Sequence, residues 1–327
     1  MSLEKLIMNI LITGVTGLVG SELAREFSAL GSIHGLKRAN ADLGAVDLDG
    51  LGIHWHEGDV LDFNSILEAV EGMDLVIHAA GKVSFLPQDE RALFQVNHQG
   101  TVNVVNALLA AGVPKLVYVS SVAALGQVPD QEEYDEKSIW VDVPNPTAYA
   151  LSKYKAELEV WRGEQEGLEV LVVNPAVVLG KISYTRSSGN LYQAVLNGAV
   201  FFPAGNLNYI DVRDAAEITR ALVEKGAWGE RFILSKESLP YEEFFQQAAQ
   251  VLGGVPPKTK LPNWLISWGF PILKGLSWLV GKKLPLTAQV AKNAQRKTRY
   301  SNQKVAEYLG FEYRTIQETL EWAKSDR

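Results

Sequence analysis

Short aliphatic and β-branched runs alternate with longer amphipathic stretches from residue 9 to about residue 178. The short runs carry no alternation of polar and apolar residues, which is expected of strands that are buried on both faces. The predicted strands are Asn9–Thr13, Ile33–Lys37, Leu75–Ala79, Lys115–Ser120 and Val170–Asn174, and the predicted helices are Leu18–Leu30, Asn64–Val70, Gly100–Ala111 and Ser152–Glu166.

Strands and helices that alternate with such short connections predict βαβ crossovers. The predicted fold class is therefore α/β, a doubly wound parallel sheet of the Rossmann type. The large domain is predicted at residues 8–180, and the chain returns to it at about 207–236 with a further strand, Arg231–Ser235. Residues 181–206 and 237–327 are predicted to form a smaller, mostly helical substrate domain, because prolines interrupt the helical pattern there.

Composition narrows the chemistry. The 327 residues include no cysteine, which excludes disulfides, thiolate catalysis and cysteine-bound metals. The net charge of −7 argues against nucleic acid as a partner. The sequence shows no recognisable signal peptide, and together with the absence of cysteine this predicts a cytoplasmic protein. Residues 1–7 contribute nothing to the predicted fold. The pair His54 and His56 fits strand alternation better than a metal site, so no metal is expected.

The segment Leu261–Val280 contains three tryptophans in twenty residues and approaches the length of a membrane span. Pro271 and Lys274 fall inside it. We therefore predict a buried or pocket-lining helical hairpin, with peripheral membrane attachment and a true span kept as alternatives.

The first predicted strand runs directly into TGVTGLVG, with glycines at positions 14, 17 and 20. Such a turn between a strand and an amphipathic helix lets the backbone approach a pyrophosphate, which the amide groups at the helix N-terminus then bind. This context makes residues 8–180 a dinucleotide-binding domain.

The end of the second predicted strand bears on the choice of dinucleotide. NAD sites usually place an acidic residue there, but this chain has Lys37 and Arg38, and its first acid is Asp42. A guanidinium suits a 2′-phosphate, so NADP is favoured over NAD. Ordinary solvated surface cations are the alternative.

Two further segments extend the predicted cofactor site. Asp59, followed by Val60, comes after a third short strand and is assigned to the adenine amino group, with a turn or helix-cap role as the alternative. The small residues Ala79, Ala80 and Gly81 let a strand end lie against the cofactor. His78 is predicted to be a hydrogen-bonded structural residue.

Tyr149 and Lys153 stand four residues apart in YALSK, on one face of a predicted helix. A nearby ammonium is expected to lower the pKa of the tyrosine, which then exchanges a proton with a carbonyl oxygen as hydride is transferred. Ser120 and Ser121 end the fourth predicted strand, where a hydroxyl can hold the same oxygen.

Taken in order, these motifs resemble the extended short-chain dehydrogenases/reductases over nearly the whole chain. The cation after the second strand and the hydrophobic C-terminal region are similar to the dihydroflavonol 4-reductase and hydroxysteroid dehydrogenase branch. The segments that carry the resemblance are TGVTGLVG (13–20), GDV (58–60), HAAG (78–81), VNHQGTVNVV (96–105), YVSSVAALG (118–126), YALSK (149–153), NPAVVLG (174–180), NYIDVRDAAEI (208–218) and YSNQKVAEYLGF (300–311).

The resemblance implies residue roles. Tyr149 is the proton donor, Lys153 holds the nicotinamide ribose, and Ser121 orients the substrate, with Ser120 as the alternative. Asn97 is assigned a capping or packing role as readily as a functional one, and Asn174 replaces the arginine usual in the family. The cofactor-binding candidates are Thr13, Gly14, Thr16, Gly17, Leu18, Val19, Lys37, Arg38, Asp59, Val60, Ala79, Ala80, Gly81, Ser120, Tyr149, Lys153, Pro175 and Val178.

The sequence as a whole predicts an NADP-preferring oxidoreductase that reduces a ketone, or oxidises a secondary alcohol, of an apolar small molecule. A nucleotide-sugar epimerase or dehydratase with tightly bound NAD is the alternative, and a non-catalytic dinucleotide-binding sensor or scaffold is the third reading. The resemblance also implies a homodimer built on Gly100–Ala111 and Ser152–Glu166.

Overall fold

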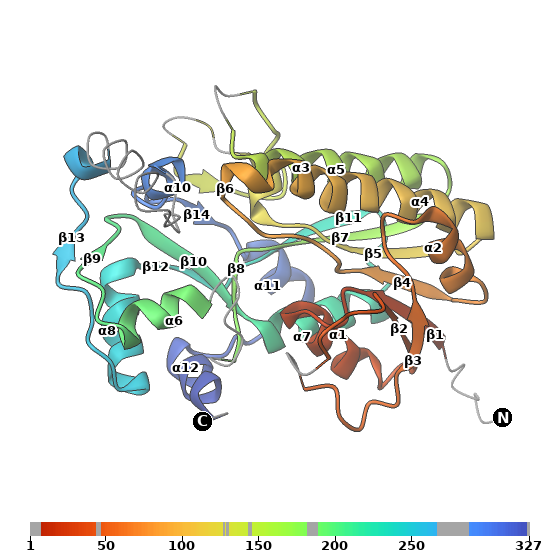
Figure 1. The fold of residues 1–327 in the computed structure, drawn as a ribbon, viewed down its shortest axis with the longest axis horizontal. Coiled ribbons are helices and arrows are strands. Elements are labelled where there is room, and N and C mark those ends of the chain that lie inside the picture. Colours follow the sequence, from red (N-terminus) through yellow and green to blue (C-terminus); the bar gives the residue numbers. More distant parts are fainter. Residues whose placement is uncertain are drawn as a thin grey trace.

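The computed structural model describes residues 8–43, 47–126, 128, 131–142, 146–181, 189–266 and 288–325. Figure 1 shows a large sheet between two layers of helices, beside a smaller group of short strands and helices.

The large sheet has seven strands in the order β11-β7-β5-β4-β1-β2-β3, and every neighbouring pair is parallel. This order confirms the predicted doubly wound fold. The chain builds from β1 toward β3 and then, from β4, in the opposite direction, so the carboxyl ends of β1 and β4 form the switch point where such sheets bind ligands. The strands are β1 (Met8–Thr13), β2 (Gly31–Lys37), β3 (His54–Glu57), β4 (Leu75–His78), β5 (Lys115–Val119), β7 (Glu169–Pro175) and β11 (Glu230–Leu234).

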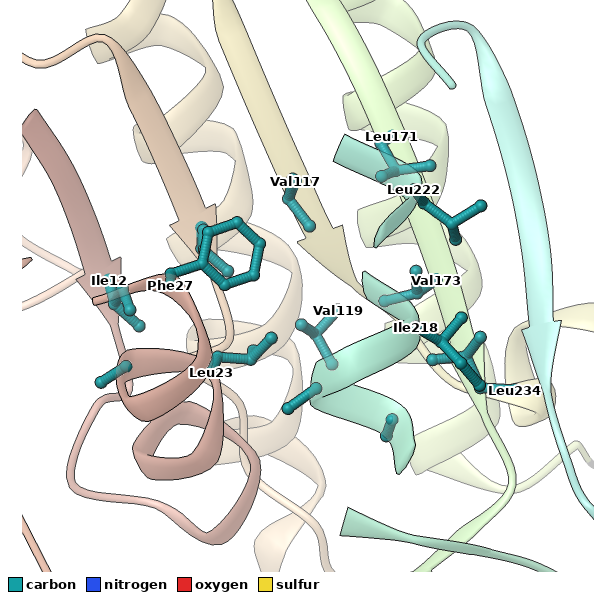
Figure 2. Packing of buried hydrophobic residues seen from close by; sticks show 14 of the residues in the cluster. Ile12, Leu23, Phe27, Val117, Val119, Leu171, Val173, Ile218, Leu222 and Leu234 are labelled. Atoms are coloured by element: carbon teal, nitrogen blue, oxygen red, sulfur yellow. The ribbon is translucent and has the colours of Figure 1, made fainter. Parts of the chain in front are cut away.

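Helices cover both faces of this sheet, which explains why its strands lack polar/apolar alternation. On one face, Leu23 and Phe27 of α1 enter the same apolar cluster as Ile218 and Leu222 of α7 (Figure 2). This layer consists of α1 (Leu18–Phe27), α7 (Val212–Glu224) and α11 (Gln303–Leu309), and the opposite layer of α2 (Phe63–Val70), α4 (Gly100–Ala111) and α5 (Ala148–Gln165).

Short irregular elements bring the chain to the carboxyl edge of the sheet. A π-helical turn, Phe94–Gln99, leads directly into α4, and such turns occur frequently at functional sites. The other short elements are the 3-10 turns Pro87–Asp89 and Val122–Leu125 and the helix α3 (Glu90–Leu93).

A second group of elements, here called the smaller lobe, is built on a sheet of order β12-β10-β8 with its own apolar core. Val305 of α11 nevertheless packs beneath the large sheet, so the chain returns to that sheet after leaving the smaller lobe. The predicted domain boundaries stay a prediction. The remaining elements are β8 (Val177–Leu179), β10 (Asn206–Asp211), β12 (Glu237–Pro240), β9 (Phe201–Phe202), β13 (Thr259–Lys260), β6 (Glu133–Tyr134), β14 (Arg299–Tyr300), α6 (Gly189–Leu196), α8 (Tyr241–Leu252), α10 (Ala288–Asn293) and α12 (Ile316–Lys324).

The predicted hairpin at Leu261–Val280 lies outside the described residues from position 267 onward. Among the helices that are described, none has the length and apolar character needed to cross a bilayer.

Candidate active site

The glycine turn lies between β1 and α1 and is packed too tightly for larger residues. Gly14 has φ +74°, and a Cβ atom there would lie 2.6 Å from the backbone nitrogen of Ala80. A Cβ atom on Gly20 would overlap the carbonyl oxygen of Gly14. The Gly17 N–H donates to that same oxygen over 2.9 Å. The three glycines therefore bring strand, turn and helix into direct backbone contact, as the sequence predicts.

The N-terminus of α1 offers unpaired amide groups at this turn. Gly17 is the N-cap and has no capping side chain, and the first helical turn carries no acidic residue. The first N–H groups of a helix have no partner within it and favour anions. The predicted residues Thr16, Leu18 and Val19 are partly exposed around this end. The arrangement fits a pyrophosphate.

His78 lies at the end of β4 in a buried chain of hydrogen bonds. The Thr101 hydroxyl donates to the Asn97 carbonyl oxygen over 2.6 Å, so it accepts from His78 Nε2–H over 3.1 Å. His78 Nδ1 then accepts from the Thr13 hydroxyl over 2.6 Å, and the Thr13 oxygen accepts the Ala80 N–H over 3.3 Å. Burial lowers the pKa of His78 to about 3, so the ring is neutral. The geometry agrees with a structural role, and it also occupies the Thr13 hydroxyl.

The end of β2 lies one strand away from the glycine turn, since Thr13 pairs with Leu36. The Lys37 ammonium lies 5.6 Å from the centre of the Trp55 ring on β3. Arg38, the next residue, is exposed, and its guanidinium has no partner within the described part of the chain. A cation without a partner is thus available beside the predicted ribose position.

Asp59 follows β3 and takes part in a turn. Its Oδ1 accepts the Leu61 N–H over 3.0 Å, whereas the N-cap of α2 is Asp62. One carboxylate oxygen of Asp59 therefore has the turn role that was kept as an alternative. The contact of Asp59 with an adenine stays a prediction. Val60 is buried, and it packs so closely on α4 that a Cβ atom on Gly100 would lie 2.9 Å from its side chain.

Tyr149 and Lys153 lie on consecutive turns at the start of α5. Thr147 caps this helix by accepting the Ala150 N–H over 3.1 Å. Lys153 is 5% exposed and donates to the Val119 carbonyl oxygen at the end of β5 over 2.9 Å. The Ser121 hydroxyl, two residues further on, lies close enough to the Tyr149 phenol to lower its pKa. The structure brings the three predicted catalytic side chains to one edge of the sheet.

The geometry separates the two neighbouring serines. Ser120 is buried, and its hydroxyl donates to Glu157 Oε2 over 2.6 Å. The Ser121 oxygen accepts the Ala123 N–H over 3.2 Å, and its hydroxyl faces Tyr149. Only the Ser121 hydroxyl therefore lies beside the phenol.

The expectation that Lys153 lowers the pKa of Tyr149 is wrong for this structure. Burial raises the pKa of Tyr149, and the hydrogen bond from Ser121 opposes that shift only in part. The Lys153 ammonium is directed to Val119 instead and lies 5.1 Å from the Tyr118 ring centre. Its own pKa is lowered to about 8 by burial, against the opposing charge of Glu157. The tyrosine is consequently protonated at neutral pH.

Sequence reasoning missed Glu157, whose carboxylate lies behind these residues. It is 4% exposed and bonds to side chains from three strand ends. The sequence could have indicated that Glu157 shares a helix face with Tyr149 and Lys153, because it continues their four-residue spacing. The sequence could not indicate its hydrogen-bond partners, since they lie at distant positions.

Asn97 and Asn174 hold backbone segments around the site. Asn97 bonds to both the N–H and the carbonyl of Lys82, over 2.7 and 3.0 Å, and to Ser152 over 2.9 Å. Its role is thus to anchor the loop after β4. Asn174 donates to the Ser121 carbonyl oxygen over 3.0 Å.

The predicted nicotinamide-pocket residues follow at the next strand end. Pro175 is buried at the end of β7, and Val178 is half-buried in β8. Their contact with a cofactor stays a prediction.

Apolar side chains surround the Tyr149 phenol on its outer side. The Phe85 and Tyr149 rings are 5.6 Å apart, and Phe85 is 43% exposed. Val83, in the same loop, is 47% exposed. Trp140 stacks on Tyr154 of α5, with ring centres 4.5 Å apart. A bound molecule would meet a largely apolar surface here.

His54 and His56 both lie on β3, at the edge of the large sheet and away from this site. His56 contacts His34 on the neighbouring strand β2. His56 Nε2 is 2.9 Å from Nδ1 of His34, and burial lowers the pKa of both rings. In the ranges that the structure describes, no group of three or more histidine, aspartate and glutamate side chains is arranged to hold a metal ion.

Comparison with known proteins gives consistent matches. Residues 10–234 match the model of the NAD-dependent epimerase/dehydratase family. The chain is 30% identical to sterol demethylase protein B of Methylococcus capsulatus over 82% of this chain and 81% of that protein. It is 28% identical to a putative dihydroflavonol 4-reductase of Synechocystis over 94% of this chain and 91% of that protein. The crystal structure of gox2253 superposes with a TM-score of 0.80 and 28% identity, covering 97% of this chain and 98% of that one.

Proposed function

Because the chain belongs to the NAD-dependent epimerase/dehydratase family, we propose that it is an NADP-preferring oxidoreductase. It reduces a ketone of an apolar small molecule, or oxidises the corresponding secondary alcohol. The observation that carries the proposal is the grouping of Tyr149 and Lys153 on one face of α5, with Lys153 anchored at the end of β5 next to Ser121 and Phe85 against the phenol ring. The similarity to a putative dihydroflavonol 4-reductase agrees with this reading.

The residues of the glycine turn fit a dinucleotide. At Gly14 the turn lies directly against the backbone of Ala79 and Ala80, where a Cβ atom has no room, and the amides of α1 would supply the donors for a pyrophosphate. In this proposal the loop after β4 and the ends of β5 and β7 would hold the nicotinamide. When bound, the nicotinamide supplies or accepts the hydride.

The proton is handled by this chain's own side chains. The phenol of Tyr149 keeps its proton at neutral pH because burial raises its pKa, so it can donate that proton to the carbonyl oxygen of a substrate. The neighbouring Ser121 hydroxyl can donate a hydrogen bond to the same oxygen and so stabilise its developing charge. Lys153, anchored to Val119, places a positive charge behind both groups while it stays protonated. In the direction of oxidation Tyr149 must first lose its own proton to solvent, and the phenolate then accepts the proton of the alcohol.

NADP is preferred to NAD in this proposal because of Arg38. The exposed guanidinium follows β2 directly and suits a 2′-phosphate, and Lys37 adds attraction nearby. NAD is the alternative cofactor.

The deciding experiment measures oxidation of NADPH at a panel of apolar ketones, aromatic and alicyclic, with purified protein. We expect turnover with at least one of them, and turnover at least about 100-fold slower in Tyr149→Phe. NAD that stays bound through purification, together with turnover of a nucleotide sugar only, would replace the proposal with the epimerase alternative. Binding of NADPH without turnover of either class would favour a sensor or scaffold.

A further inference from the structure

Glu157 is a carboxylate enclosed within the large domain. It follows Lys153 by one turn of α5 and Tyr149 by two, so the three side chains share one helix face. A carboxylate in such a place requires hydrogen bonds and opposite charges to replace its lost hydration. The partners of Glu157 therefore show which parts of the site it holds.

One carboxylate oxygen connects the ends of two strands. Glu157 Oε2 accepts the Ser120 hydroxyl over 2.6 Å and the Asn174 amide over 2.8 Å. The same Asn174 amide donates to the Ser121 carbonyl oxygen over 3.0 Å. The peptide segment that presents the Ser121 hydroxyl is thus fixed to Glu157 twice, directly at Ser120 and through Asn174 at Ser121.

The other oxygen faces a third strand. Glu157 Oε1 lies 3.2 Å from Arg231 Nη1 on β11 and accepts the Trp161 indole N–H over 3.4 Å. Arg231 is 24% exposed at its side chain, against 5% for Glu157. The ion pair therefore runs from the interior toward solvent.

Glu157 lies one helical turn from Lys153, and its charge acts on the ammonium although no direct ion pair joins the two in the described part of the chain. On α5 the groups around Lys153 are Tyr149, which is protonated, and Glu157, whose charge raises the pKa of Lys153 against burial. On β5 and β4 they are the Tyr118 ring and His78, whose pKa the Lys153 charge lowers. Tyr118 and His78 are uncharged, so within the described residues the negative charge at Lys153 comes from Glu157.

We propose that Glu157 is a positioning residue of this site: it is the buried counter-ion of Lys153, and through Ser120 and Asn174 it holds Ser121 beside Tyr149. This inference rests on the proposed function, because it concerns the same site. It adds a second role for α5, which supplies the acid–base pair and also joins the ends of β5, β7 and β11 beneath it.

The test uses NADPH binding, because binding requires no turnover. Fluorescence titrations between pH 6 and pH 10 compare the unmodified protein with Glu157→Gln and with the matched control Glu159→Gln. Glu159 lies on the same helix, but it pairs with Arg162 at the surface. Lys153→Met identifies which part of the pH dependence belongs to Lys153.

We expect the affinity of the unmodified protein to fall with a midpoint near pH 8, as Lys153 loses its proton. In Glu157→Gln the midpoint should move to lower pH by about one unit, so that binding at pH 8 weakens up to about tenfold. Glu159→Gln should match the unmodified protein, and Lys153→Met should remove the transition. An unchanged midpoint in a folded Glu157→Gln protein overturns the proposal.

A second variant covers the case in which Glu157→Gln does not fold. Arg231→Gln keeps the negative charge of Glu157 and removes its positively charged partner. Because Glu157 then acts more strongly on Lys153, the midpoint should move to higher pH. An unchanged or lower midpoint overturns the proposal. Because these titrations measure binding and not turnover, failure of the proposed reaction and failure of the Glu157 assignment give different results.

Discussion

The ring of Phe85 meets the Tyr149 phenol edge-on, with ring centres 5.6 Å apart and planes inclined by 71°. Phe85 belongs to the loop after β4, whereas Tyr149 begins α5. Since 43% of Phe85 is exposed, much of its surface is left for contact with a bound molecule directly beside the proton donor.

Phe85→Ala should therefore weaken binding of an apolar substrate. Loss of this aromatic surface is expected to raise KM about tenfold, equivalent to about 1.4 kcal/mol, and to leave NADPH affinity unchanged. Leu158→Ala is the control, because Leu158 is also exposed, at 48%, but lies more than two turns of α5 beyond Tyr149. Equal effects of the two substitutions on KM would contradict a substrate contact at Phe85.

Tyr149→Phe removes the hydroxyl that donates the proton and keeps the ring. Turnover should fall at least about 100-fold, or about 2.7 kcal/mol in the barrier, because no other group replaces the donor. NADPH affinity should persist within a few-fold, and fluorescence titration checks it. A variant that turns over the substrate at the original rate would exclude Tyr149 as the acid.

Arg38→Asp should reverse the cofactor preference. Charge-assisted hydrogen bonds to a 2′-phosphate are worth about 1.5–3 kcal/mol, so the unmodified protein should bind NADPH about 10- to 150-fold more tightly than NADH. The aspartate repels the phosphate and accepts the ribose hydroxyls instead. Titration of both cofactors measures the change, and Arg38→Lys, which keeps the charge, should retain the NADPH preference. Equal affinities in the unmodified protein would mean that Arg38 does not contact the cofactor.

His78 should make the fold sensitive to acid. Its pKa is about 3 in the folded chain and near 6.5 when unfolded, so between these values only the unfolded chain takes up a proton. The contribution of His78 to stability is complete above pH 6.5 and falls as the pH drops toward 3, by about 1.4 kcal/mol per pH unit within that window.

Denaturant unfolding between pH 8 and pH 4 measures this effect. In His78→Asn unfolding should take up as much as about one proton fewer than in the unmodified protein. Its free energy of unfolding should therefore change less with pH. His98→Gln, at a surface position 3.9 Å from Glu159, is the control and should keep the original slope. Identical slopes for the His78 variant and the unmodified protein would show that His78 is not the group responsible.

The sequence predicted the large sheet well because its strands are continuous apolar runs between recognisable turns. Gly100–Ala111 has the predicted bounds, whereas the first helix ends at Phe27 rather than Leu30. The strands of the smaller lobe were not predicted: β9 and β13 have two residues each, too few for any periodic pattern to appear.

Within the site, prediction failed where the answer depended on side chains from distant positions. The family resemblance assigned Ser121 to the substrate, with Ser120 as the alternative, whereas the bond that holds Ser120 away from the phenol comes from Glu157 on α5, a distant position. The pKa of Tyr149 depends mainly on burial, and the four-residue spacing to Lys153 does not predict how deeply the phenol is buried. Helical spacing correctly placed the two side chains together, but it did not show that the ammonium turns toward Val119.

The hydrogen-bond chain through His78 has a consequence for how the site can move. It begins at Ala80, beside the glycine turn, and ends at the backbone of Asn97, whose side chain is hydrogen-bonded to the Lys82 backbone. These hydrogen bonds connect the loop that carries Phe85 to the glycine turn. Phe85 should therefore move together with the glycine turn, so that its distance from a cofactor bound at that turn stays constant when other parts of the chain move.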